Sequence, residues 1–190
     1  MPESIIAERL RRQGLAKPLQ SKGNVVELFR KLQPVAPLAY SYPGTPTRLI
    51  HRTVFHDGEV LDELRGERTI IKGRFQKGLV SYVLAEDLQL YATAFRKSLA
   101  DLNDTQHRVL DVVQEIGPAK TDQIKEVVDQ DEGELLLKKQ IMPALHRVQE
   151  AFVVLKNQTE TNWDRGWSDF ASEWPAVDFE PSCGSKLQRK

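Results

Sequence analysis

The stretch RTIIKGRFQKGLVSYVLAEDL, residues 68–88, decides the predicted fold of the chain. Two runs rich in β-branched and aromatic residues, 69–75 and 79–84, flank a short connection that ends in Gly78. Glycine readily adopts the positive φ that a tight hairpin needs. Short helical patterns precede this hairpin and a longer one follows it, so the order predicts the wing of a winged-helix module. The basic residues on or beside the predicted wing are Lys72, Arg74 and Lys77.

A basic hairpin of this kind has two interpretations. A basic wing is a common way to hold the phosphate backbone of a nucleic acid. Small α+β domains also carry hairpins whose lysines are simply solvated. Both interpretations stay open on the local pattern alone.

Three short helices are predicted before the hairpin, with a further short helical segment through residues 48–50. The first covers residues 5–14 and the second covers 25–32, with apolar residues on one side of each. Gln33 precedes a proline and ends the second helix, because a residue before proline avoids the α region. The third helix covers 59–64. The predicted N-cap residues are Ser4, Asn24 and Asp57.

After the hairpin, apolar residues at three- and four-residue steps from Leu88 to Leu102 predict an amphipathic helix that closes the first module. A second module then begins, where Asn103 and Gln106 have the spacing of a capping box. Gly117, followed by proline, predicts the end of that helix.

The rest of the second module repeats the order of the first. Thr121 caps a short helix, and an acidic turn over 129–134 leads to a longer helix. Pro143 either kinks that helix or marks a fresh first turn. A strand over 152–155 and a return strand over 162–167 complete a second wing.

The predicted fold is therefore mainly α (α+β), with tandem winged-helix modules, each a three-helix core with a β-hairpin wing. The modules are expected over residues 1–101 and 102–180, and residues 181–190 are expected to form a disordered tail.

Charge is unevenly distributed although the net charge is zero. Residues 1–100 contain 16 Lys and Arg against 10 Asp and Glu, and residues 101–190 contain 11 against 17. The first module is therefore expected to be the better binder of a polyanion.

A single cysteine, Cys183, excludes an intramolecular disulfide and a cysteine-based metal cluster. The four histidines lack the spacing of a metal site, so neither a metal nor a cofactor is expected. No apolar run has the length of a signal peptide or a membrane span. The expected location is cytoplasmic, in association with the nucleoid, or nuclear.

Several segments in order resemble one family. These are RLRRQGL (9–15), VVELFRKLQPVAP (25–37), RLIHRT (48–53), KGLVSYVLAEDL (77–88) and NDTQHRVLDVVQEIGPAKTDQI (103–124). Together they are similar to the winged-helix DNA glycosylases that remove alkylated bases and unhook interstrand crosslinks. The resemblance covers roughly residues 8–170 and corresponds to the N-terminal part of that family. It implies that double-stranded DNA is the partner.

The resemblance also places a catalytic motif. In the family, a glutamine at the end of the second helix is followed two residues later by a glutamine or an aspartate. Gln33 matches the first position, whereas Val35 occupies the second and can neither hold a water nor stabilise charge. The family's Arg-Gly-Thr-Leu-His hairpin corresponds here to Lys-Gly-Leu-Val-Ser at 77–81. If the chain is an enzyme, it is a DNA N-glycosylase that uses Gln33; otherwise Gln33 satisfies backbone groups near the helix end.

Two non-catalytic functions compete with base excision. One is a winged-helix transcriptional regulator, and the other is a protein-interaction module, which suits the acidic second half. Residues predicted to contact DNA are Arg52, Lys72, Arg74, Lys77, Lys138, Lys139 and Arg147.

Aromatic residues gather after the second predicted wing. They are expected to pack a short C-terminal helix, to stack on bases, or to dock a third module or a second copy of the chain. The tryptophans of this cluster are Trp163, Trp167 and Trp174.

Overall fold

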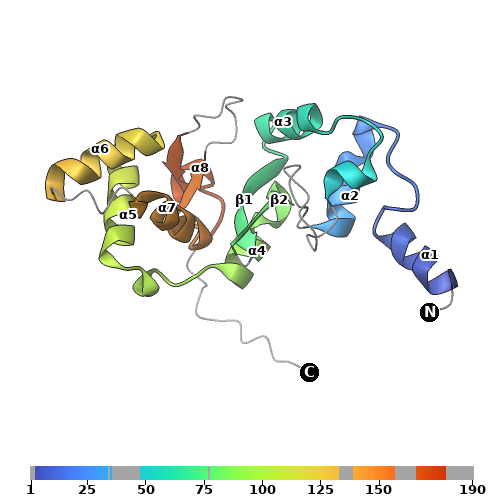
Figure 1. Cartoon of the computed structure of the whole chain (residues 1–190), viewed down its shortest axis with the longest axis horizontal. Coiled ribbons are helices and arrows are strands. Elements are labelled where there is room, and N and C mark those ends of the chain that lie inside the picture. Colours follow the sequence, from blue (N-terminus) through green and yellow to red (C-terminus); the bar gives the residue numbers. More distant parts are fainter. Residues whose placement is uncertain are drawn as a thin grey trace, which may run out of the picture. The chain divides into compact units, whose positions relative to one another are not determined.

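A computed structural model of the chain describes residues 3–33, 35, 48–76, 78–132, 139–156 and 166–178. The structure is mainly helical with two small antiparallel β-hairpins, which confirms the α+β class (Figure 1). Among the helices it describes, none is long and apolar enough to cross a membrane.

The chain divides into two compact units. The described residues up to Asp87 form the first unit, and nearly all of those from Leu88 onward form the second. The helix that follows the first hairpin therefore falls in the second unit, whereas the sequence places it at the end of the first module.

Over its described residues, the first unit contains three helices, one hairpin and three short 3₁₀ turns. The helix predicted over 25–32 matches the observed one at both ends. The elements are α1 (Glu3–Arg12), η1 (Lys22–Asn24), α2 (Val25–Leu32), η2 (Leu49–Arg52), α3 (Gly58–Gly66), β1 (Ile70–Gln76), β2 (Leu79–Leu84) and η3 (Ala85–Asp87).

The first hairpin forms as predicted. Gly78 has a φ of 69°, the left-handed conformation expected of the turn glycine. Lys72 pairs with Tyr82 across the ladder. Val35 then pairs with Tyr82 from the other edge of β2, with N–O distances of 3.0 and 2.8 Å. The strand β2 therefore pairs with β1 on one edge and with Val35, three residues after the end of α2, on the other.

None of the three predicted N-caps forms its side-chain bond. Ser4 lies inside α1, which begins at Glu3. Asn24 and Asp57 do precede their helices, but neither side chain accepts a helix N–H. An N-cap needs an extended backbone, whereas Asn24 has a ψ of 2° and Asp57 a ψ of −10°. The near-helical backbone turns both side chains away from the amides.

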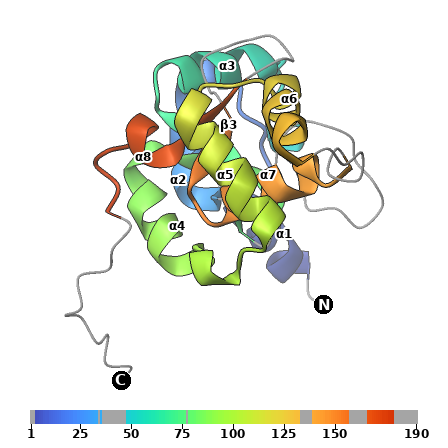
Figure 2. The same cartoon turned by 90° about the vertical axis from the view of Figure 1, so that its left-hand side faces the viewer.

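The second unit consists of a helical core with a short hairpin. In it α5, α6 and α7 pack on one another (Figure 2). The elements are α4 (Leu88–Phe95), η4 (Leu99–Asp101), α5 (Asp104–Ile116), α6 (Thr121–Glu132), α7 (Ile141–Glu150), β3 (Val154–Lys156), β4 (Trp167–Asp169) and α8 (Phe170–Glu173).

Local signals in the second unit are partly confirmed. The capping box forms, since the Asn103 side chain accepts from Gln106 N at 3.0 Å and Gln106 Oε1 accepts from Asn103 N at 3.1 Å. Pro143 is the third residue of α7, so it marks a first turn and not a kink. The prediction of an acidic turn is wrong for residues 129–132, because α6 continues to Glu132.

Other boundaries in the second unit differ from those predicted. The helix α4 ends at Phe95, well before Leu102, and Ser98 then caps η4 by accepting from Ala100 N. In the second hairpin β3 begins two residues later than predicted, and β4 ends two residues later than predicted. Phe152 adopts a φ of 57°, so the expected first strand residue is a left-handed turn residue.

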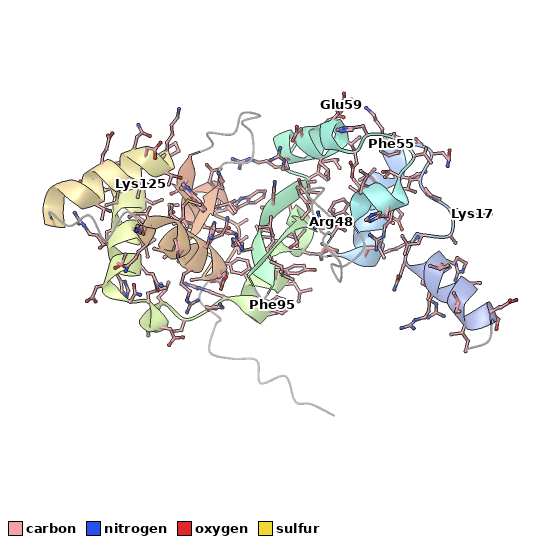
Figure 3. The ribbon with its side chains drawn as sticks, viewed as in Figure 1. Lys17, Arg48, Phe55, Glu59, Phe95 and Lys125 are labelled. Carbon is pink, nitrogen blue, oxygen red and sulfur yellow. The ribbon has the colours of Figure 1, made fainter. Side chains whose placement is uncertain are left out.

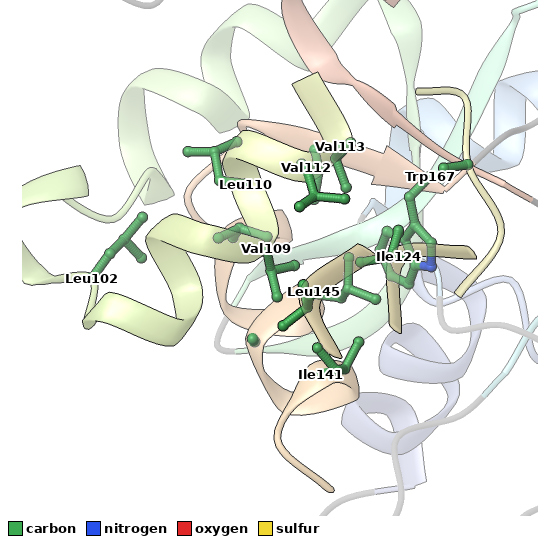
Figure 4. Close-up of a cluster of buried hydrophobic side chains, with 14 residues drawn as sticks. Leu102, Val109, Leu110, Val112, Val113, Ile124, Ile141, Leu145 and Trp167 are labelled. Carbon is green, nitrogen blue, oxygen red and sulfur yellow. The ribbon is translucent and has the colours of Figure 1, made fainter. Parts of the chain in front are cut away.

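Trp167 belongs to the buried hydrophobic core of the second unit (Figure 4). It is 2% exposed, and its indole Nε1 donates to Thr121 Oγ1 at 3.1 Å. Its backbone also pairs with Ala119, with N–O distances of 2.9 and 2.7 Å. This pairing holds β4 against Ala119, which lies three residues after the end of α5.

Candidate functional site

Gln33, the predicted catalytic glutamine, ends α2 beside the first hairpin. Its Oε1 accepts a hydrogen bond from Leu84 N at 2.9 Å, and its Nε2 donates to the carboxylate of Asp87. Two residues later, Val35 is 3% exposed and pairs with β2. Both ends of the glutamine amide are therefore engaged, and they join the end of α2 to the end of β2.

Asp87 brings to Gln33 a carboxylate that sequence reasoning missed. It ends η3, and it is half-buried where it accepts from the glutamine amide. The neighbouring Glu86 points to another partner and accepts from Arg30 Nε at 3.0 Å. Because 54 residues separate Gln33 from Asp87, no local pattern could have connected them.

Lys72 lies half-buried on the side of the hairpin that carries Tyr82. Its Nζ is 5.8 Å from the centroid of the Tyr82 ring, within the range of a cation–π contact. Burial, with the nearby Arg65 guanidinium, lowers the pKa of Lys72. Burial also raises the pKa of Tyr82 to about 12, which keeps that ring neutral.

The other predicted cations of the first unit also serve the fold. The Arg74 guanidinium donates to Gly78 O and closes the hairpin turn. Arg52 is 7% exposed, and it donates to Gln13 O at 2.7 Å and to Arg48 O at 2.9 Å. Its burial lowers the pKa of the Arg52 guanidinium. Lys77 lies outside the described residues.

The surface of α3 is acidic, which sequence reasoning did not weigh. Glu59, Asp62 and Glu63 are exposed, and Figure 3 shows Glu59 on the outer side of the helix. Arg65, its one arginine, is 3% exposed and donates to Asp62. A phosphate backbone would be repelled by this face.

In the second unit the predicted cations lie on or next to α7. Lys139 is exposed just before α7 begins. Arg147 is half-buried, and its Nη1 is buried without a hydrogen-bond partner. The ring of His146 lies 6.4 Å from that of Trp167. Lys138 lies outside the described residues.

Packing is one of the three roles predicted for the aromatic residues after the second wing, and it is the role that the described residues support. Trp167 is a core residue and Trp174 is half-buried, whereas Trp163 lies outside the part of the chain that is described. Over that same part, no group of three or more His, Cys, Asp or Glu is placed to hold a metal ion.

Asp57 is the most unusual ionisable residue in the first unit. It is 0% exposed, and neither carboxylate oxygen has a hydrogen-bond partner. Burial raises the pKa of this carboxyl group, with the neighbouring His56 acting in the opposite direction. The folded state therefore binds this proton more tightly than the unfolded chain does.

This burial predicts a pH-dependent stability. As the pH rises above the pKa of an unfolded aspartate, the unfolded chain releases the Asp57 proton first, so the free energy of unfolding falls. We expect Asp57→Asn to raise the melting temperature at pH 7, and the gain to vanish near pH 4. Thermal denaturation of both proteins across that range checks this, and a gain that is constant with pH would contradict it.

We compared the chain with protein-family models, with curated protein sequences and with solved structures, and none of the three comparisons gives a match.

Proposed function

We propose that this protein binds double-stranded DNA through two winged-helix units. The observation that carries the proposal is a pairing that both units share. In each, the third residue after a helix pairs with the second strand of the hairpin: Val35, after α2, pairs with Tyr82, and Ala119, after α5, pairs with Trp167. Among the described residues, two further helical segments lie between that residue and the hairpin, η2 and α3 in the first unit and α6 and α7 in the second. This is the order of elements in winged-helix proteins, whose third helix enters the major groove.

The charges favour different roles for the third helical segments of the two winged-helix units. In the first unit this helix is α3, whose exposed carboxylates disfavour contact with phosphate. In the second unit it is α7, which begins next to the exposed Lys139. We therefore propose that α7 is the helix that meets DNA. The basic hairpin residues of the first unit then contribute mainly through positive potential.

Lys139→Ala tests the proposed contact. Loss of one phosphate contact should weaken binding to all duplex sequences about 3- to 10-fold at roughly 100 mM salt and should reduce the salt slope by about 1. Fluorescence anisotropy with a random duplex at several salt concentrations measures both quantities. The matched control is Lys125→Ala on α6. Lys125 Nζ lies 3.4 Å from Asp122 Oδ1, so this lysine already has an ion-pair partner.

Two outcomes would reject this assignment. If the native chain does not bind duplex DNA, or binds it independently of salt, a protein-interaction module becomes the better explanation. If Lys125→Ala weakens binding as much as Lys139→Ala does, α7 is not the specific contact.

Base excision is a second candidate, favoured by the contact between Gln33 and Asp87. Cleavage of an N-glycosidic bond develops positive charge on the sugar and needs a positioned water. Val35 supplies no base, but the carboxylate of Asp87 has the chemistry to accept a proton from water. In this candidate Gln33 orients Asp87 through its amide, and Asp87 acts as the base.

A further inference from the structure

Helix α1 presents an apolar side that stays exposed in the part of the chain that the structure describes. Ile5, Ile6 and Leu10 are 47%, 46% and 40% exposed, and none of the ten residues of α1 is buried. A helix this short is marginal in water by itself, and helices in proteins gain most of their stability by packing an apolar face. Within the described residues, α1 therefore lacks the packing contact that would normally stabilise such a helix.

The end of α1 is nevertheless firmly attached to its unit. Gly14 has a φ of 65°, and a Cβ there would lie 2.8 Å from Leu28 Cδ1, so the chain approaches α2 closely. Arg52 also donates to Gln13 O at 2.7 Å. In Figure 1 the helix projects from the rest of its unit beyond this attachment. These contacts hold the residues that follow α1, while the apolar side chains of the helix stay exposed.

The charges along α1 are arranged from acidic to basic. Glu3 lies in the first turn, and the last turn is basic. Glu8 is bound to Arg11 and Arg12, each at 2.7 Å. Among the described residues, Glu3 has no ion-pair partner. The arginines of the last turn are Arg9, Arg11 and Arg12.

We propose that a second copy of the chain covers α1, and that two α1 helices pack antiparallel about a two-fold axis. This arrangement sets Glu3 of one copy beside the arginine-bearing end of the other, whereas a parallel pair would bring like charges together. Ile6 and Leu10 lie four residues apart on one face, so they form the seam, with Ile5 at its margin.

The charges favour a second copy over an anionic surface. Two of the three arginines of α1 are already bound to Glu8, and Glu3 would be repelled by phosphate or lipid headgroups. A pair of ten-residue helices is small compared with the roughly 800 Å² per partner of a stable interface. The dimer is therefore expected to be concentration-dependent.

Sedimentation velocity on the full chain tests the dimer. Between about 5 and about 500 µM, the native mass should rise from that of a monomer toward that of a dimer. The double variant Ile6→Glu with Leu10→Glu should raise the dissociation constant at least about 10-fold, because charge enters the seam. Leu79→Glu is the matched control, since Leu79 is 62% exposed on the hairpin and should leave association unchanged.

Variants in which the charges at the two ends of α1 are reversed test the antiparallel arrangement. This test does not depend on the folding of the Ile6 and Leu10 variants. Glu3→Arg alone and the double variant Arg9→Glu with Arg12→Glu should each self-associate more weakly than the native chain. An equimolar mixture of the two should associate again. A native chain that stays monomeric over the whole range, or a mixture that does not associate, would overturn the proposal. Binding of the monomer to anionic vesicles, without self-association, would assign α1 to a membrane surface instead.

Discussion

Replacing Trp167 by alanine is expected to lower the free energy of unfolding of the second unit by about 3–5 kcal/mol. The side chain is 2% exposed and packs among the residues of α5, α6 and α7, so its removal leaves a large cavity. The same residue holds β4 to Ala119 through two backbone hydrogen bonds. The alanine variant keeps both backbone bonds, so the loss should come from the missing packing and from the missing indole donor to Thr121 Oγ1.

A second variant separates packing from hydrogen bonding at this position. Trp167→Phe keeps most of the apolar volume but removes the donor to Thr121 Oγ1, and should cost less than the alanine variant. Trp174→Ala is the control, because Trp174 is only half-buried. Urea denaturation followed by circular dichroism measures all three. If Trp174→Ala destabilises as much as Trp167→Ala does, the assignment of Trp167 to the centre of the core is wrong.

Asp87→Asn is expected to lower base release at least about 100-fold if the chain is a glycosylase, because asparagine cannot accept a proton from water. Asparagine still offers an oxygen to the Gln33 amide, so folding and DNA binding should change little. Release of bases from duplex DNA that contains alkylated purines measures the effect. Glu86→Gln is the control, since Glu86 is paired with Arg30 and not with Gln33.

Gln33→Ala should behave differently from Asp87→Asn. It leaves Leu84 N without its acceptor, and an unsatisfied buried amide costs about 1–3 kcal/mol, so this variant should be less stable. A loss of activity in Gln33→Ala could therefore come from lower stability as well as from a missing catalytic contact. Asp87→Asn avoids this ambiguity because its stability should change little. No base release by the native chain would end the enzymatic candidate, and equal release by Asp87→Asn would remove Asp87 as the base. In either case DNA binding through α7 would stand untouched.

The sequence by itself determined the local features. Gly78 could be assigned to the hairpin turn and Asn103 with Gln106 to a capping box, because both depend on residues within one turn of each other. The ends of α2 followed from its apolar stripe and the proline after Gln33. The sequence failed at Asn24 and Asp57, where a suitable residue type meets a near-helical backbone.

Only the tertiary structure decided which polar residues are available for function. Arg52 is a surface cation by residue type, yet it is buried and bonded to the backbone of Gln13, 39 residues away. Gln33 meets Asp87 only because β2 lies against the end of α2. Trp167 is a core residue because β4 pairs with Ala119. Such placements depend on contacts between distant segments, and residue spacing along the chain does not encode them.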